Sequence, residues 1–191
     1  MRRLFQRSGA TVAALGILVT AAAAQSPAAQ TPPAPQPKSP RNWTELRVPE
    51  EGFRVEFPAA PRNTNTVEGA AKSWAVELDN GYTAYLLSFS DLDPDHVRRT
   101  GAQGVLDGGV KGGTDRFPGA VTVSHTSIQV GGHPGRELQL KVTFENQPYR
   151  VLARMFLIER RLYVFTAISS EGKTDNQEVS RFLDSFALIA R

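Results

Sequence analysis

The chain has 191 residues, of which 40% are hydrophobic and 21% are charged. This length fits one domain with additional segments or one large domain, and the composition excludes a wholly disordered or collagen-like chain. Cysteine is absent, which excludes disulfides, cysteine-ligated metals and cysteine nucleophiles. The formal net charge is +3, but three of the 22 basic residues lie in the first 24 positions, and the rest balance the 19 acidic residues. A nucleic-acid or anionic-membrane partner therefore has no electrostatic support.

Residues 1–24 have the three parts of a secretory signal peptide. Three arginines form a positive start, the following segment is apolar or small, and an Ala-x-Ala cleavage pattern ends at Ala24. The apolar run is shorter than the ~20 residues of a membrane-spanning helix. We expect cleavage before Gln25 and a bacterial periplasmic or secreted protein, without a transmembrane helix in its mature form. Arg2-Arg3 also fits a weak twin-arginine signal, so the export route stays open.

Residues 25–41 intersperse prolines with Ala, Gln and Ser. Nothing in this stretch could bury a core, and proline-rich segments extend as polyproline II. We expect a disordered linker, either a stalk or a plain spacer, followed by one folded domain over 42–191. A domain of that size buries about 70% of its unfolded surface, so its core needs no disulfides.

The first elements of this domain are predicted to be strands. Residues 53–57 alternate apolar and polar side chains and stop at a proline. Two further alternating runs, 74–78 and 82–89, flank Asn80-Gly81, which is the strongest short hairpin signal. This turn sets the pairs Trp74–Leu87 and Val76–Tyr85.

A helix follows from Asp93-Pro94, which supplies a cap and a proline at the first helical position. Apolar positions continue the helix to Leu106, but glycines weaken it by ~1 kcal/mol each. We expect the glycine-rich stretch from Gly101 to Gly113 to be a loose helix end that runs into a mobile loop.

The second half of the domain is predicted to hold four strands and a helix. The strands span 121–130, 136–145, 149–158 and 161–169, and tight turns lie at Gly131-Gly132, Asn146-Gln147 and Glu159-Arg160. The third strand is apolar on both faces, so it should be central and covered on both sides. The last helix carries an apolar stripe and a capping box of Thr174 and Gln177. The stripe consists of Val179, Phe182, Leu183 and Phe186.

Tight turns make neighbouring strands antiparallel. The predicted fold class is therefore α+β, with a single antiparallel β-sheet flanked by helices.

The domain resembles the PsbP-like family, which includes the photosystem protein PsbP, bacterial DcrB-type proteins and the yeast Ran-binding Mog protein. Residues 52–58, residues 132–137, Arg160-Arg161-Leu162-Tyr163 and the terminal helix carry the resemblance, which covers about residues 44–189. It implies an α/β/α sandwich and a non-catalytic binding or assembly role.

Catalytic and metal-binding patterns are weak. His96, His125 and His133 show no zinc-ligand spacing, and no serine lies in a nucleophile motif. We therefore expect no enzyme activity and no cofactor. The alternative is a hydrolase or metal-dependent enzyme whose site is assembled from distant residues, which a cluster of His125 with acidic residues at an open pocket would favour.

Asp91, Asp93 and Asp95 have the alternating acids of a calcium loop, but the glycine and glutamate of an EF-hand are missing. Capping of the following helix and acids at its N-terminus explain the same pattern. These residues are a weak calcium candidate, and we expect no metal site.

The predicted registers bring five residues to one face of the sheet: Glu137, Arg154, Phe156, Tyr163 and Phe165. In these registers Phe156 lies opposite Glu137 and Tyr163, and Arg154 lies opposite Phe165 and Gln139. One interpretation is a groove for a ligand or protein partner, with Arg154 and Tyr163 as its polar groups. The other, which we favour, is an internal Glu137–Arg154 pair beneath a helix. The expected function is an exported, non-enzymatic envelope protein that binds a protein partner or a small ligand.

Overall fold

A computed structural model describes residues 41–64, 72–78, 83–172 and 175–190. The predicted signal peptide and the predicted linker as far as residue 40 lie outside these residues. The elements in chain order are β1 (Thr44–Val48), the 3-10 turn η1 (Pro49–Glu51), β2 (Phe53–Phe57), β3 (Arg62–Asn63), β4 (Lys72–Leu78), β5 (Thr83–Asp91), α1 (Pro94–Asp115), β6 (Val121–Val130), β7 (His133–Phe144), β8 (Gln147–Ile158), β9 (Arg161–Ser170), α2 (Asn176–Asp184) and β10 (Ala187–Leu188).

The strands form two antiparallel sheets. The larger sheet has the order β3-β4-β5-β9-β8-β7-β6, and the smaller has the order β1-β2-β10. The predicted α+β class with an antiparallel sheet is confirmed. The smaller sheet is an addition to the single sheet predicted. It forms because Phe53, Val55 and Phe57 of β2 bury their side chains against the face of the larger sheet instead of extending its edge.

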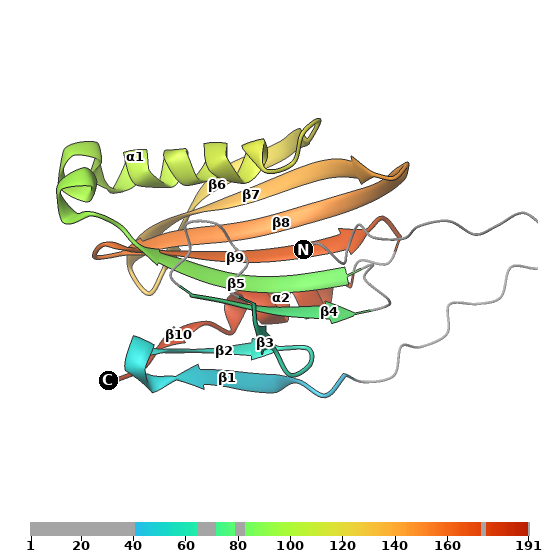
Figure 1. Cartoon of the computed structure of the whole chain (residues 1–191), viewed down its shortest axis with the longest axis horizontal. Helices are drawn as coiled ribbons and strands as arrows, with labels where there is room; N and C mark the ends of the chain where they lie inside the picture. The colour runs from blue at the N-terminus through green and yellow to red at the C-terminus, as the bar shows by residue number, and fades with distance from the viewer. Residues whose placement is uncertain (1–40, 65–71, 79–82, 173–174, 191) are drawn as a thin grey trace, which may run out of the picture.

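The molecule has three layers (Figure 1). Helix α1 lies along one face of the larger sheet, and the smaller sheet and α2 lie against the other. Helix α1 connects β5 to the far edge strand β6, and β7, β8 and β9 then return until β9 pairs with β5. This crossover carries the helix across the sheet and covers the strand predicted to be central.

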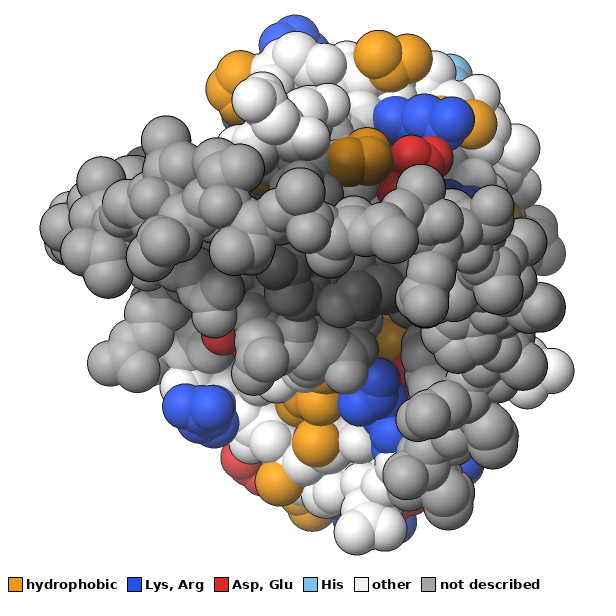
Figure 2. All heavy atoms as spheres, turned by 90° about the vertical axis from the view of Figure 1, so that its right-hand side faces the viewer, with side chains coloured by type: hydrophobic (Ala, Val, Ile, Leu, Met, Phe, Trp, Pro, Cys, Tyr) orange, Lys and Arg blue, Asp and Glu red, His pale blue; other side chains and the backbone are white. Residues whose placement is uncertain are grey.

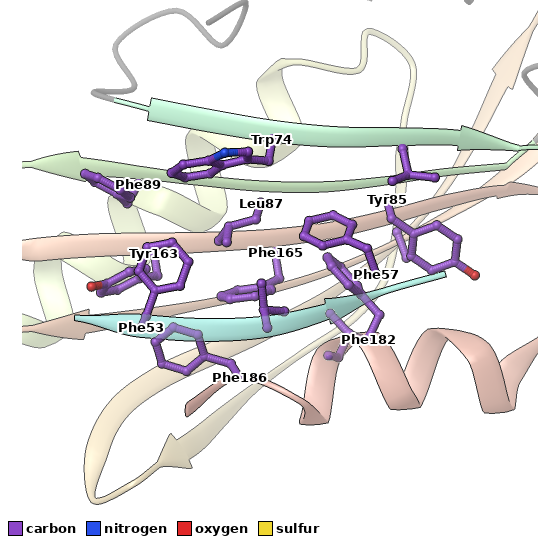
Figure 3. Packing of buried hydrophobic residues seen from close by; sticks show 14 of the residues in the cluster. Phe53, Phe57, Trp74, Tyr85, Leu87, Phe89, Tyr163, Phe165, Phe182 and Phe186 are labelled. Atoms are coloured by element: carbon purple, nitrogen blue, oxygen red, sulfur yellow. The ribbon is translucent and has the colours of Figure 1, made fainter. Parts of the chain in front are cut away.

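Aromatic side chains fill the space between the larger sheet and the smaller one (Figure 3). Phe53 of β2 lies 5.8 Å from Tyr163 of β9, measured between ring centroids. Phe57 lies 5.0 Å from Phe182 of α2. Such pairs contribute about 0.5–1.5 kcal/mol each beyond the burial of their area. All four residues of the predicted apolar stripe belong to this core, but α2 ends at Asp184, so Phe186 lies just beyond the helix.

Helix α1 is longer than predicted. Its N-cap is Asp93, whose side chain accepts a hydrogen bond from the backbone N–H of His96, as predicted. Gly101 interrupts it with φ 72° and ψ 160°, and the helix then continues through the other glycines to Asp115. The expected loop is therefore wrong, because packing against β7 and β8 stabilises a helix that its glycines alone would not hold.

Two hairpin registers are as predicted. Trp74 pairs with Leu87, and Phe156 pairs with Tyr163. The turn residues Asn80-Gly81 lie outside the described residues.

The β7–β8 register differs by two residues from the prediction. The turn consists of Glu145 and Asn146, which both have positive φ, so Glu137 pairs with Arg154 rather than with Phe156. A shift of two keeps every side chain on its predicted face, because side chains alternate with a period of two.

The N-cap of α2 is Asp175, whose carboxylate accepts hydrogen bonds from the backbone N–H groups of Gln177 and Glu178. The predicted cap, Thr174, lies outside the described residues. Asp175 is itself a preferred capping residue and stands one position nearer the helix.

Strand β6 forms one edge of the larger sheet and carries no Lys, Arg, Asp or Glu. Val121 and Val123 are 63% and 53% exposed there. The β6–β7 register shifts between Thr122 and Ser124, which marks a β-bulge at Val123.

Candidate functional site

The predicted aromatic–arginine face is covered. Phe156, Tyr163 and Phe165 are at most 2% exposed and belong to the aromatic core beneath the smaller sheet. The rings therefore offer almost no surface to a ligand, and the binding role suggested for them stays a prediction.

The charged part of the predicted set forms an ion pair. Arg154 Nε donates to Glu137 Oε2 at 2.6 Å, and its Nη1 donates to Asp184 of α2. The Arg154 and Glu137 side chains are 23% and 21% exposed. Burial lowers the pKa of Arg154, but the hydrogen bonds to Asp184 and Glu137 outweigh it and raise that pKa above its usual value. Arg154 thus holds the end of α2 onto β7 and β8.

The three aspartates of the calcium candidate have separate partners. Asp91 accepts two hydrogen bonds from Arg161, Asp93 caps α1, and Asp95 pairs with Arg98. Among the described residues, no group of three His, Asp or Glu side chains is placed to hold a metal ion.

The histidines lie apart on different elements: His96 in the first turn of α1, His125 in β6 and His133 at the start of β7.

A charged cluster surrounds Arg161 at the end of the β8–β9 hairpin. Its guanidinium contacts Asp91 and Glu51 at 2.7 Å and lies 4.0 Å from the centre of the Phe89 ring. The hydrogen bonds to Asp91 raise the pKa of Arg161 above its usual value, against the effect of burial. Glu51 is also bonded to Lys72, which lowers the pKa of Glu51 below 4.5. The adjoining hollow of about 450 Å³ has a largely charged lining, in which Glu51 and Asp91 are both bonded to Arg161 and which also includes Glu159 and Arg160.

A second hollow among the described residues lies on the opposite face of the sheet, beside α1. It is a groove of about 300 Å³ between the second half of α1 and strands β5, β7, β8 and β9. Its aliphatic lining includes Leu86, Leu138, Leu140, Val151, Met155 and Leu162. We call it the α1 groove.

Two glycines set the height of α1 above the groove floor. A Cβ atom at Gly109 would lie 2.7 Å from Met155 Sδ, and one at Gly113 would lie 3.3 Å from Leu138 Cδ2. A larger residue at either position would push the helix away from the sheet. Gly112 lines the groove, and a Cβ there would meet nothing within 4 Å.

Ion pairing fixes α1 beside the groove. Arg136 of β7 is buried, and its guanidinium donates to Asp107 at 2.8 Å and to Gln103 at 2.7 Å, both on α1. The helix is therefore attached on the β7 side, and the groove opens along its other side, toward β5 and β9.

The polar groups of the groove are few. Ser88, Ser90 and Thr166 contribute hydroxyl groups, and Arg116 at the end of α1 is the only charged residue among the described residues that line it. Small-molecule sites are typically apolar hollows of about 300–1,000 Å³ with a few polar groups. The α1 groove has this character, whereas the hollow beside Arg161 does not.

The α1 groove was not predicted from the sequence, because the stretch from Gly101 to Gly113 was expected to be a loose helix end followed by a loop. The signal that was available is the four-residue spacing of Gly109 and Gly113, which places both on one helix face. Glycines on a sheet-facing side let the helix lie close to the sheet and leave the lining of the groove to the side chains of the sheet.

No protein-family model matches the sequence, and curated proteins give no match. Among solved structures, the chain is similar to cyanobacterial PsbP (CyanoP) from Synechocystis sp. PCC 6803, with a TM-score of 0.59 and 15% identity over 76% of this chain and 92% of that chain. It is also similar to the Ran-binding protein Mog1p of Saccharomyces cerevisiae, with a TM-score of 0.50 and 9% identity over 78% of this chain and 97% of that one. The predicted PsbP-like fold is confirmed.

Figure 2 views the end of the molecule that lies on the right in Figure 1. Positively and negatively charged side chains lie near one another there, with hydrophobic side chains between them.

Within the described ranges, no helix has the length and apolar character needed to cross a membrane.

Proposed function

We propose that this chain is an exported, non-enzymatic binding protein of the bacterial envelope, and that the α1 groove is its ligand site. The observation that carries the proposal is the groove itself: an aliphatic hollow of about 300 Å³ between the sheet and a helix whose lining positions are glycines. Export is proposed from the signal-peptide pattern of residues 1–24.

Binding is favoured over catalysis by the lining of the groove. Proton transfer usually needs a His, Asp, Glu or Lys near the reacting atoms, and the described lining supplies hydroxyls and one arginine. His125, the residue that would favour an enzyme, lies on the edge strand β6 and outside that lining. The fold is also that of a binding protein, the Ran-binding Mog1p.

Two glycines of α1 provide a matched test of the site. Gly112 lines the groove and Gly108 does not, yet a Cβ at either meets nothing within 4 Å. Each is helical, so leucine should raise helix stability at both by up to about 1 kcal/mol. We expect Gly112→Leu to block binding of an aliphatic probe such as decanoate, measured by calorimetry, while Gly108→Leu binds as the wild type does. Equal binding by both variants would remove the groove as the site.

The export half of the proposal has its own measurement. The mass of the protein purified from its native source should correspond to a chain that begins at Gln25. A protein that retains Met1 in the membrane fraction would contradict cleavage.

A further inference from the structure

The chemistry of the α1 groove specifies its ligand more closely, an argument that rests on the proposed function. The side chains packed on the two faces of the larger sheet differ chemically. Rings fill the space under the smaller sheet, whereas the groove lining is aliphatic, with Phe117 as the single aromatic residue among its described members. An aliphatic hollow gives a flexible hydrocarbon chain close contact along its length but gives a flat ring no partner for stacking.

The size of the groove limits the ligand to a slender one. Its volume of about 300 Å³ lies at the lower end of the range for small-molecule sites, about 300–1,000 Å³. The sheet floor is continuous from β5 through β9 and β8 to β7, so the space is bounded by the sheet on one side and by α1 on the other. A single chain of moderate length fits this space, and a two-chain lipid or a folded peptide does not.

Charge marks one end of the groove. Arg116 caps the C-terminal end of α1 and is exposed. The remaining polar lining consists of neutral hydroxyls, with Ser88 and Thr166 buried on the floor. A guanidinium binds carboxylate and phosphate oxygens with charge-assisted hydrogen bonds. An acidic head at Arg116 would therefore leave its hydrocarbon chain over Leu86, Leu162 and Val164, which are among the more accessible aliphatic residues of the lining.

We propose that the α1 groove binds a single-chain anionic amphiphile, with the aliphatic chain in the groove and a carboxylate or phosphate head at Arg116.

Calorimetry on the mature chain tests this with three probes that share one chain: decanoate, decyl phosphate and the uncharged decanol. We expect the better anionic probe to bind at least about tenfold more tightly than decanol, since a hydrogen bond to a charged group is usually worth that factor. The comparison of decanoate with decyl phosphate identifies the preferred head. Equal affinity for all three probes would overturn the proposal.

Variants assign the preference to Arg116. Arg116→Gln should bind the anionic probe about as weakly as decanol, and Arg116→Lys, which keeps the charge, should retain part of the preference. Arg98→Gln is the control, because it removes a positive charge from α1 at a side chain that is 73% exposed and outside the groove lining. A preference that survives in Arg116→Gln would overturn the proposal.

The two proposals fail in different ways. If decanol and the anions bind equally and Gly112→Leu blocks all of them, the groove is a binding site without charge selectivity, and only the further inference is lost. If no probe binds the wild type, or if Gly112→Leu binds every probe normally, the groove is not the site and both proposals fall.

Discussion

Arg154 shows how one side chain can join two layers. It lies on β8 and contacts Glu137 on β7 and Asp184 on α2. A charge in a partly buried position must be paired or must reach water, and this arginine does both. Arg154, which the sequence analysis gives as a candidate binding residue, therefore has a structural role: it joins α2 to the larger sheet.

Replacement of Arg154 by alanine should destabilise the fold. The change leaves Glu137 partly buried without its cation, and we expect a loss of about 1–3 kcal/mol, between the values for exposed and for fully buried pairs. Chemical denaturation of Arg154→Ala measures the loss. Arg98→Ala, which breaks the exposed pair with Asp95, should change the free energy of unfolding by no more than about 1 kcal/mol. An unchanged stability for Arg154→Ala would argue against the structural role.

Most of the elements could be predicted from the sequence, because strand alternation and turn residues are local signals. The hairpin β8–β9 has its predicted turn at Glu159 and Arg160 and its predicted register. The smaller sheet was not predicted: β1 and β2 form a local hairpin, but β10 joins β2 only through the fold of the whole chain. The α1 groove was not predicted either: the spacing of Gly109 and Gly113 indicates a glycine face if the stretch is a helix, but the helix itself depends on packing against β7 and β8.

Two glycines of helix α1, one at its interruption and one in its regular part, should respond in opposite ways to replacement by alanine. Gly101 has φ 72° and ψ 160°, a conformation almost restricted to glycine, so Gly101→Ala should cost about 1–3 kcal/mol. Gly108 is helical with open space around it, and Gly108→Ala should instead stabilise the protein by about 0.5–1 kcal/mol. Thermal unfolding of both variants gives the signs. The same sign for both would mean that Gly101 is not a fixed kink.

At the scale of the whole molecule, the charged cluster around Glu51 joins the smaller sheet to the larger one. Glu51 belongs to η1 and bonds to Lys72 of β4 and to Arg161 of β9. These cations hold the pKa of Glu51 below 4.5, chiefly through the hydrogen bond from Lys72. A carboxylate whose pKa is lower in the folded state stabilises that state above its unfolded pKa, and the contribution is lost as the pH falls through the folded value.

The stability conferred by Glu51 should therefore depend on pH. We expect the difference in unfolding free energy between wild type and Glu51→Gln to be largest at neutral pH and to shrink as the pH falls below 4.5. Urea denaturation of both proteins across this range measures it. The exposed pair of Lys111 with Asp115 provides a reference, since Asp115→Asn should show a much smaller difference. A difference that is independent of pH would show that Glu51 acts through packing alone.

The bulge at Val123 bears on the solubility of the protein. Edge strands with free backbone groups are templates for association, and charged side chains, prolines or bulges normally protect them. Strand β6 has neither charge nor proline, so the irregularity between Thr122 and Ser124 is the protective feature within the strand. In concentrated solutions of this protein, one extra residue therefore hinders the ten-residue edge strands of two molecules from pairing side by side and starting a fibre.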